Sequence, residues 1–124
     1  MVELRFEGRG NVKLGVMPAY NAGGPGLPRA CLVLSDDGIE ADLPTAIRRR
    51  FVPRWYSSFE DVLAVELVQA RGVALMLTRR GSDLHLVFWP GSETDLDAIL
   101  DVLIARGVED IDTSVRHLGP GGVG

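Results

Sequence analysis

The chain has 124 residues, of which 46% are hydrophobic and 24% charged, the balance of an ordinary globular protein rather than of a disordered or fibrous one. Its formal net charge of -4 argues against a general nucleic-acid binder, because such proteins owe their affinity to many phosphate-neutralising cations. A single cysteine, Cys31, excludes an internal disulfide and a multi-cysteine metal site.

Neither export nor membrane insertion is expected. The first ten residues, MVELRFEGRG, mix charged with apolar residues and lack the apolar core of a secretory signal. Nowhere does the sequence contain a run of about 18 apolar residues, the length that a helix needs to cross a bilayer. A reducing cytoplasm suits the lone cysteine, so we expect a cytoplasmic protein.

Two short strands are predicted near the N-terminus. Apolar residues alternate with charged ones from Val2 to Phe6, and the alternation resumes from Val12 to Val16. Gly8 and the Gly10-Asn11 pair lie between the two runs and predict a turn. The stretch 18–28, rich in proline and glycine, predicts a flexible loop.

A β-hairpin is predicted next. The apolar run Ala30–Leu34 is followed by Asp36-Asp37-Gly38, a tight-turn signal, and then by alternating apolar and acidic residues from Ile39 to Leu43. A short strand is predicted over 50–55. It contains Pro53, which cannot donate a backbone hydrogen bond, so we expect this strand at a sheet edge or a bulge.

Three further strands complete the β-region. Val62–Gln69 reads as a strand that places three aliphatic side chains on one face: Leu63, Val65 and Leu67. Val73–Thr78 and Leu84–Trp89 are joined by five turn-forming residues and predict a second hairpin. Because no crossover helix separates these short strands, we expect an antiparallel meander.

One amphipathic helix is predicted over 92–106. Ser92 is placed to cap its first turn, with Asp95 three residues later, and Gly107-Val108 reads as a glycine stop with an apolar contact back onto the last turn. The helical repeat places five aliphatic residues on one face: Leu96, Ile99, Leu100, Leu103 and Ile104. Beyond it, we expect one domain over 1–116 and a disordered glycine-rich tail over 117–124.

The order of these elements resembles a pleckstrin-homology-like (PH-like) domain. More narrowly, the sequence resembles bacterial PH-like and GRAM-like families in three places that together span residues 30–108: the hairpin segment 32–40, the strand entry 58–65, and the final hairpin with its helix. The resemblance implies a mainly β fold, an antiparallel β-sandwich or barrel capped by helix 92–106. It also implies a binding or scaffolding module without a cofactor.

No catalytic or metal-binding constellation is recognisable in the sequence. His85 and His117 do not have a ligand spacing, and neither a Gly-x-Ser-x-Gly motif nor a phosphate-binding glycine loop before a helix is present. Between Val2 and Val16 the chain also departs from the basic pattern that phosphoinositide binders carry on their first hairpin. We therefore expect a protein that is not an enzyme and holds no metal.

One strong charge asymmetry remains, the arginine cluster of Arg48, Arg49, Arg50 and Arg54. No acidic residue lies between Asp42 and Glu60. The cluster can be a solvated loop whose arginine stems lie over apolar neighbours. It can also be a docking patch for an anion or an acidic protein, with Trp55 and Tyr56 as aromatic anchors.

The leading functional prediction is therefore a module for protein–protein interaction or scaffolding, with the partner unidentified. A homodimer is one variant, because strand edges and the aliphatic residues on both faces of Leu84–Trp89 need covering. The alternative is weak, salt-sensitive binding to an anionic membrane or ligand through Arg48–Tyr56. A third possibility is a small-molecule or enzymatic pocket that the sequence does not reveal.

Overall fold

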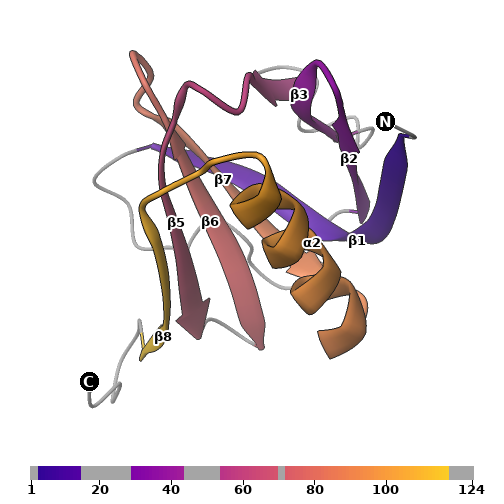
Figure 1. The fold of residues 1–124 in the computed structure, drawn as a ribbon. Coiled ribbons are helices and arrows are strands. Elements are labelled where there is room, and N and C mark those ends of the chain that lie inside the picture. Colours follow the sequence, from indigo (N-terminus) through magenta and orange to yellow (C-terminus); the bar gives the residue numbers. More distant parts are fainter. Residues whose placement is uncertain (1–2, 15–28, 44–53, 70–71, 118–124) are drawn as a thin grey trace.

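The computed structural model describes residues 3–14, 29–43, 54–69 and 72–117. They form one eight-stranded sheet of order β4-β3-β2-β1-β7-β6-β5-β8, with one helix between the last two strands of the chain (Figure 1). The elements are β1 (Leu4–Leu14), β2 (Arg29–Ser35), β3 (Gly38–Asp42), β4 (Arg54–Ser57), β5 (Val62–Gln69), β6 (Val73–Arg79), β7 (Leu84–Pro90), α2 (Glu93–Ala105) and β8 (Ile111–His117).

The N-terminal strand β1 is continuous, so the turn predicted at 8–11 is wrong. Its first half pairs with β2 and its second half with β7, and Figure 1 shows the strand bending between these partners. A Cβ atom at Gly8 would overlap the carbonyl oxygen of Trp89 and lie 2.8 Å from Phe88 Cζ. The glycine therefore permits close packing of β1 against β7 instead of reversing the chain.

Both predicted hairpins are confirmed. Ser35 pairs with Gly38 across a two-residue turn, and Gly38 has a φ of 140°, a conformation that glycine adopts without strain. Strands β6 and β7 pair antiparallel in the second hairpin. The strand predicted over 50–55 is described only from Arg54, where β4 begins, and it runs on to Ser57; Pro53 lies outside the described residues. Strand β4 pairs with β3 and is the last strand at its end of the sheet, which is the edge position expected.

Strand β5 is confirmed, but its aliphatic residues do not all share one face. The register with β6 shifts between Val62 and Ala64, which is a β-bulge at Leu63. Val65 and Leu67 are buried, whereas Leu63 is 42% exposed. A bulge inserts one extra residue and so redirects the side chain that it carries.

Helix α2 begins and ends where the sequence predicts. Ser92 Oγ accepts a hydrogen bond from the Asp95 amide at 3.1 Å. At the other end Gly107 has a φ of 86° and Val108 N–H donates to the Leu103 carbonyl, which is the Schellman arrangement. The helix buries three residues, Ile99, Leu100 and Leu103, while Ile104 remains 59% exposed.

Strand β8 was not predicted. It pairs with β5 in parallel, and the Val65 amide donates to the Asp110 carbonyl at 2.9 Å where the pairing begins. The antiparallel expectation therefore holds for every described strand pair except this one. His117, which the sequence placed in the tail, is the last residue of this strand.

The main apolar core lies on the sheet face that α2 covers, where Leu32, Leu75 and Phe88 meet Ile99 and Leu103. Four buried hydrophobic residues lie outside this core, and the strand registers place them on the opposite face: Val68, Ala74, Val87 and Trp89. Both faces of β7 are thus buried within one chain, so its aliphatic residues do not require a second copy to cover them. The architecture of the described part of the chain is mainly β with a single helix near the C-terminal end, consistent with a PH-like β-sandwich capped by a helix.

Candidate functional site

The predicted arginine cluster is described only in part. Arg48, Arg49 and Arg50 lie outside the described residues, so their joint patch stays a prediction. Arg54 lies on β4, and its Nε pairs with Glu40 Oε1 on β3 at 2.7 Å. The one described guanidinium of the cluster is therefore already matched by a carboxylate across the strand.

The two predicted aromatic anchors lie on opposite faces of β4. Trp55 is 3% exposed, and its Nε1 donates to the Leu84 carbonyl at 3.1 Å. Trp55 is therefore a core residue and not an exposed anchor. Tyr56 is 44% exposed, and its hydroxyl donates to the Asp37 carbonyl at 2.6 Å in the β2–β3 turn.

The outer edge of β4 is also occupied in part. Arg79 Nη1, at the end of β6, donates to the Tyr56 carbonyl at 2.8 Å. Together with the Trp55 bond to Leu84, this contact holds β4 against the β6–β7 hairpin and closes the sandwich at that corner. An edge strand blocked in this way is a poor template for adding a strand from another protein.

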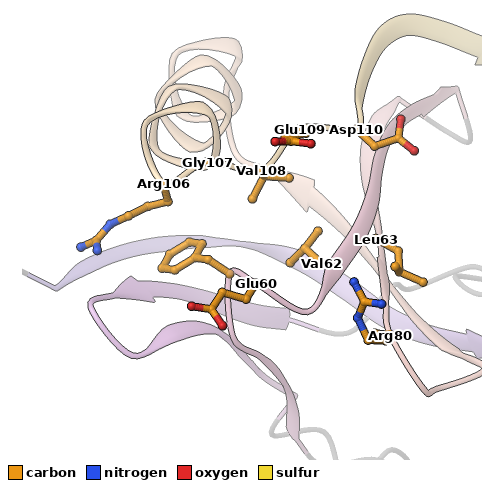
Figure 2. Close-up of a pocket in the computed structure, with 10 residues that line it drawn as sticks. Glu60, Val62, Leu63, Arg80, Arg106, Gly107, Val108, Glu109 and Asp110 are labelled. Atoms are coloured by element: carbon orange, nitrogen blue, oxygen red, sulfur yellow. The ribbon is translucent and has the colours of Figure 1, made fainter.

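A different site opens where β5 begins. A pocket of about 300 Å³ lies between the start of β5 and the link from α2 to β8 (Figure 2). It will be called the β5 pocket. Its lining comes from three separate stretches of sequence: Phe59, Glu60, Val62 and Leu63; Arg80; and Arg106, Gly107, Val108, Glu109 and Asp110.

Local structure explains why the β5 pocket is open. Strand β8 pairs with β5 only from Val65 onward, so the first three residues of β5 have β6 on one side and no described strand on the other. The bulge at Leu63 lies in this stretch. The glycine stop of α2 turns the chain away at Gly107, and Val108 then packs into the core at 7% exposure.

The base of the pocket is apolar and its rim is charged. Val62 and Val108 are buried, and Phe59 packs against the core. Figure 2 shows Glu60 at the entry to β5, with Glu109 and Asp110 on the opposing link between α2 and β8. Side chains from distant parts of the sequence thus surround one apolar depression.

The two arginines that line the pocket are paired with carboxylates, whereas three of its acidic residues are not paired with a described cation. Arg106 Nη2 bonds to Asp36 Oδ1, and its guanidinium lies 5.3 Å from the centre of the Phe59 ring. Arg80 Nε lies 3.9 Å from Asp61 Oδ1. Within the described ranges no ion pair involves the three remaining carboxylates, Glu60, Glu109 and Asp110.

Two further side chains that could take part in chemistry, His85 and Cys31, lie away from the β5 pocket. His85 Nδ1 lies 3.1 Å from Thr78 Oγ1 on the neighbouring strand. Burial raises the pKa of the Cys31 thiol, which favours the unreactive protonated form. No group of three or more His, Cys, Asp and Glu side chains within the described part of the chain is arranged to hold a metal ion.

Comparisons with known proteins add one finding on the fold. No protein-family model matches the sequence, and no curated protein matches it. A solved chain from the structure of the Spt16D Pob3N heterodimer is similar, with a TM-score of 0.59 and 7% identity over 100% of this chain. The match covers 60% of that longer chain, and at this identity it shows the fold alone.

The similarity supports a PH-like fold but does not extend to the bacterial or GRAM-like families that the sequence resembles. No helix among the residues 3–14, 29–43, 54–69 and 72–117 is long and apolar enough to cross a bilayer.

Proposed function

We propose that this chain is a non-catalytic binding module that holds an extended segment of another protein in the β5 pocket. The observation that carries the proposal is the start of β5, which has β6 on one side, no described strand on the other, and an apolar depression beside it. A free strand edge offers backbone donors and acceptors, and a neighbouring pocket can select side chains of the added segment. This combination is the requirement for recognition by strand addition.

The size and charge of the pocket define the partner segment. About 300 Å³ is at the lower end for ligand pockets, so it suits a few side chains rather than a whole helix. The apolar base formed by Phe59, Val62 and Val108 suits an aliphatic side chain. The unpaired carboxylates at the rim suit a lysine or arginine beside it.

The fold comparison supports this class of function. The similar solved chain is named as part of a heterodimer, so a domain of this fold occurs in a protein–protein assembly. By contrast, the described part of the predicted cationic surface offers little to a membrane, because Arg54 is paired with Glu40 and Trp55 is buried. The membrane alternative therefore depends on residues 48–50.

Site-specific photo-crosslinking tests the proposal. Leu63→p-benzoylphenylalanine places the photoreactive group at the pocket, where the native side chain is 42% exposed. Leu4→p-benzoylphenylalanine is a matched control, because Leu4 is 37% exposed and does not line the pocket. After irradiation in a lysate of the source cells, we expect a discrete conjugate from position 63, with one extended peptide of the partner attached.

Charge reversal distinguishes specific crosslinking at the pocket from nonspecific crosslinking. In the Leu63 variant, Glu60→Lys with Glu109→Lys should abolish the conjugate, whereas Asp97→Lys with Asp101→Lys on the exposed side of α2 should not. All variants should retain the far-ultraviolet circular dichroism of the parent. Conjugates that form equally from positions 4 and 63, or that survive the pocket charge reversal, would contradict the proposal.

A further inference from the structure

The edge of β5 that borders the pocket is closed at one end. Strand β8 runs parallel to β5 and meets it at Val65, whose amide donates to the Asp110 carbonyl at 2.9 Å. A segment that pairs with residues 62–64 therefore meets the link between α2 and β8 at its end nearest Val65. At that point the segment either turns out of the sheet or has its own terminus.

The closed end of this edge carries negative charge. Glu109 and Asp110 are exposed on the link, and no ion pair among the described residues involves either of them. The C-terminal end of α2 also borders the pocket, through Arg106 and Gly107, and the carbonyl end of a helix carries a partial negative charge. Both arginines that line the pocket are paired with carboxylates that do not line it. A positive group is therefore favoured at this end.

This charge selects the direction of an added segment. In antiparallel pairing, the first residue of the segment lies at the Val65 end, and the later residues run toward Glu60 at the entry to β5. In parallel pairing, the last residue lies beside Glu109 and Asp110 instead. A terminal carboxylate there is repelled by like charges, whereas a terminal ammonium group is attracted and can donate three hydrogen bonds.

We propose that the β5 pocket recognises the free N-terminus of a partner polypeptide, added antiparallel to β5. This inference rests on the strand addition proposed above and names the part of the partner that binds. The α-ammonium group pairs with the carboxylates of Glu109 and Asp110. An aliphatic side chain among the first three residues occupies the apolar base, and a following lysine or arginine lies near Glu60. Capture of a terminal amine is one of the general modes of peptide recognition.

The site thereby distinguishes a chain end from the same sequence inside a longer chain. An internal segment has a neutral amide in place of the ammonium group, so it loses the charge-assisted hydrogen bonds to the link. It also has to leave the sheet where the Asp110 carbonyl occupies the next position along β5. The ammonium group fixes the register of the partner, because its carboxylate partners lie only at the closed end.

The test uses an array of synthetic octapeptides, attached through their C-termini and probed with the full chain. Valine, leucine and isoleucine are varied over the first three positions, with lysine or serine at the next two. Each sequence is made with a free α-amine, as the desamino analogue, and with an added N-terminal Gly-Ser. In solution titrations of the best sequences, we expect the free form to bind about tenfold or more tightly than either other form.

Neutral substitutions in the protein locate the group that recognises the amine. Glu109→Gln with Asp110→Asn should abolish the difference between the free and desamino peptides. Asp97→Asn with Asp101→Asn removes the same charge from the exposed side of α2 and should leave that difference unchanged. All four side chains are exposed, so both double variants should keep the circular dichroism and melting temperature of the parent.

The outcomes separate this inference from the function on which it rests. If the three peptide forms bind equally, and Glu60→Lys with Glu109→Lys abolishes their binding, N-terminal recognition is overturned while strand addition at the pocket stands. A difference between free and desamino peptides that persists in the Glu109→Gln, Asp110→Asn variant also overturns it. If no form shows binding that depends on the pocket, both proposals are overturned.

Discussion

Substituting Gly8 with alanine tests the packing of β1 against β7 most directly. The added Cβ would overlap the Trp89 carbonyl oxygen and lie 2.8 Å from Phe88 Cζ and 3.1 Å from Phe88 Cε1. Phe88 is fully buried, and the Trp89 carbonyl belongs to the β7 backbone, so neither neighbour can move without separating the two strands. The substitution therefore acts on the centre of the sheet.

The expected cost follows from two contributions. Overpacking a core site by one carbon costs about 1–3 kcal/mol. Each ladder hydrogen bond lost between β1 and β7 adds about 1 kcal/mol. We expect Gly8→Ala to lower the free energy of unfolding by about 3 kcal/mol or more, a large share of the ~5–15 kcal/mol typical of a domain.

Urea denaturation followed by circular dichroism measures this change. Gly91→Ala is the matched control, because the contacts of its Cβ begin at 3.3 Å, with the Glu7 carbonyl oxygen. We expect it to remain within about 1 kcal/mol of the parent. If Gly8→Ala proved as stable as Gly91→Ala, the close approach of β1 and β7 would be refuted.

Three further predictions concern the corners of the sandwich and its one thiol. Arg106→Ala should cost about 1–2 kcal/mol in urea denaturation, because it removes a partly exposed ion pair and the contact with Phe59, and an unchanged midpoint would contradict this. Trp55→Phe should cost about 1–2 kcal/mol by leaving the partly buried Leu84 carbonyl without its donor, whereas unaltered stability would show that this bond is dispensable. Because burial raises the pKa of Cys31 above its ordinary value of 9.0, the folded state binds the thiol proton more tightly, and stability should fall as pH rises through and above that value. Cys31→Ser should remove that pH dependence in urea titrations, and an identical dependence in both proteins would assign it elsewhere.

The parts of the fold that the sequence predicted are those specified by neighbouring residues. Ser92 caps α2, and Gly107 ends it, through hydrogen bonds to residues three to five positions away. The turn at Asp36–Gly38 is likewise local. Such features depend on backbone chemistry within one turn, so their sequence signals are direct.

The features that the sequence did not predict depend on contacts between distant segments. Gly8 reads equally as a turn residue or as a site of close strand approach, and only the position of Phe88 and Trp89 decides between them. Strand β8 has a weak apolar pattern and is fixed by parallel pairing to β5. The sequence predicts Trp55 as an exposed anchor, but the alternation of side chains along β4 places it in the core.

The candidate site also depends on contacts between distant segments, so the sequence did not predict it. The β5 pocket combines residues near 60, 80 and 108, which no spacing rule connects. Its one local signal is the apolar pair Val62-Leu63 immediately after the acidic pair Glu60-Asp61, and the bulge that exposes Leu63 is not encoded in a recognisable motif. A site built from strand edges and link residues therefore becomes visible only when the sheet order is known.

Amide hydrogen exchange at the start of β5 tests the central claim most directly. The chain would be measured alone and with the partner peptide recovered from the Leu63 cross-link. Strand addition predicts slower exchange on binding at the Leu63 amide, with smaller changes at Glu109 and Asp110. Protection confined to β4, or no protection in any of these segments, would contradict recognition at the β5 pocket.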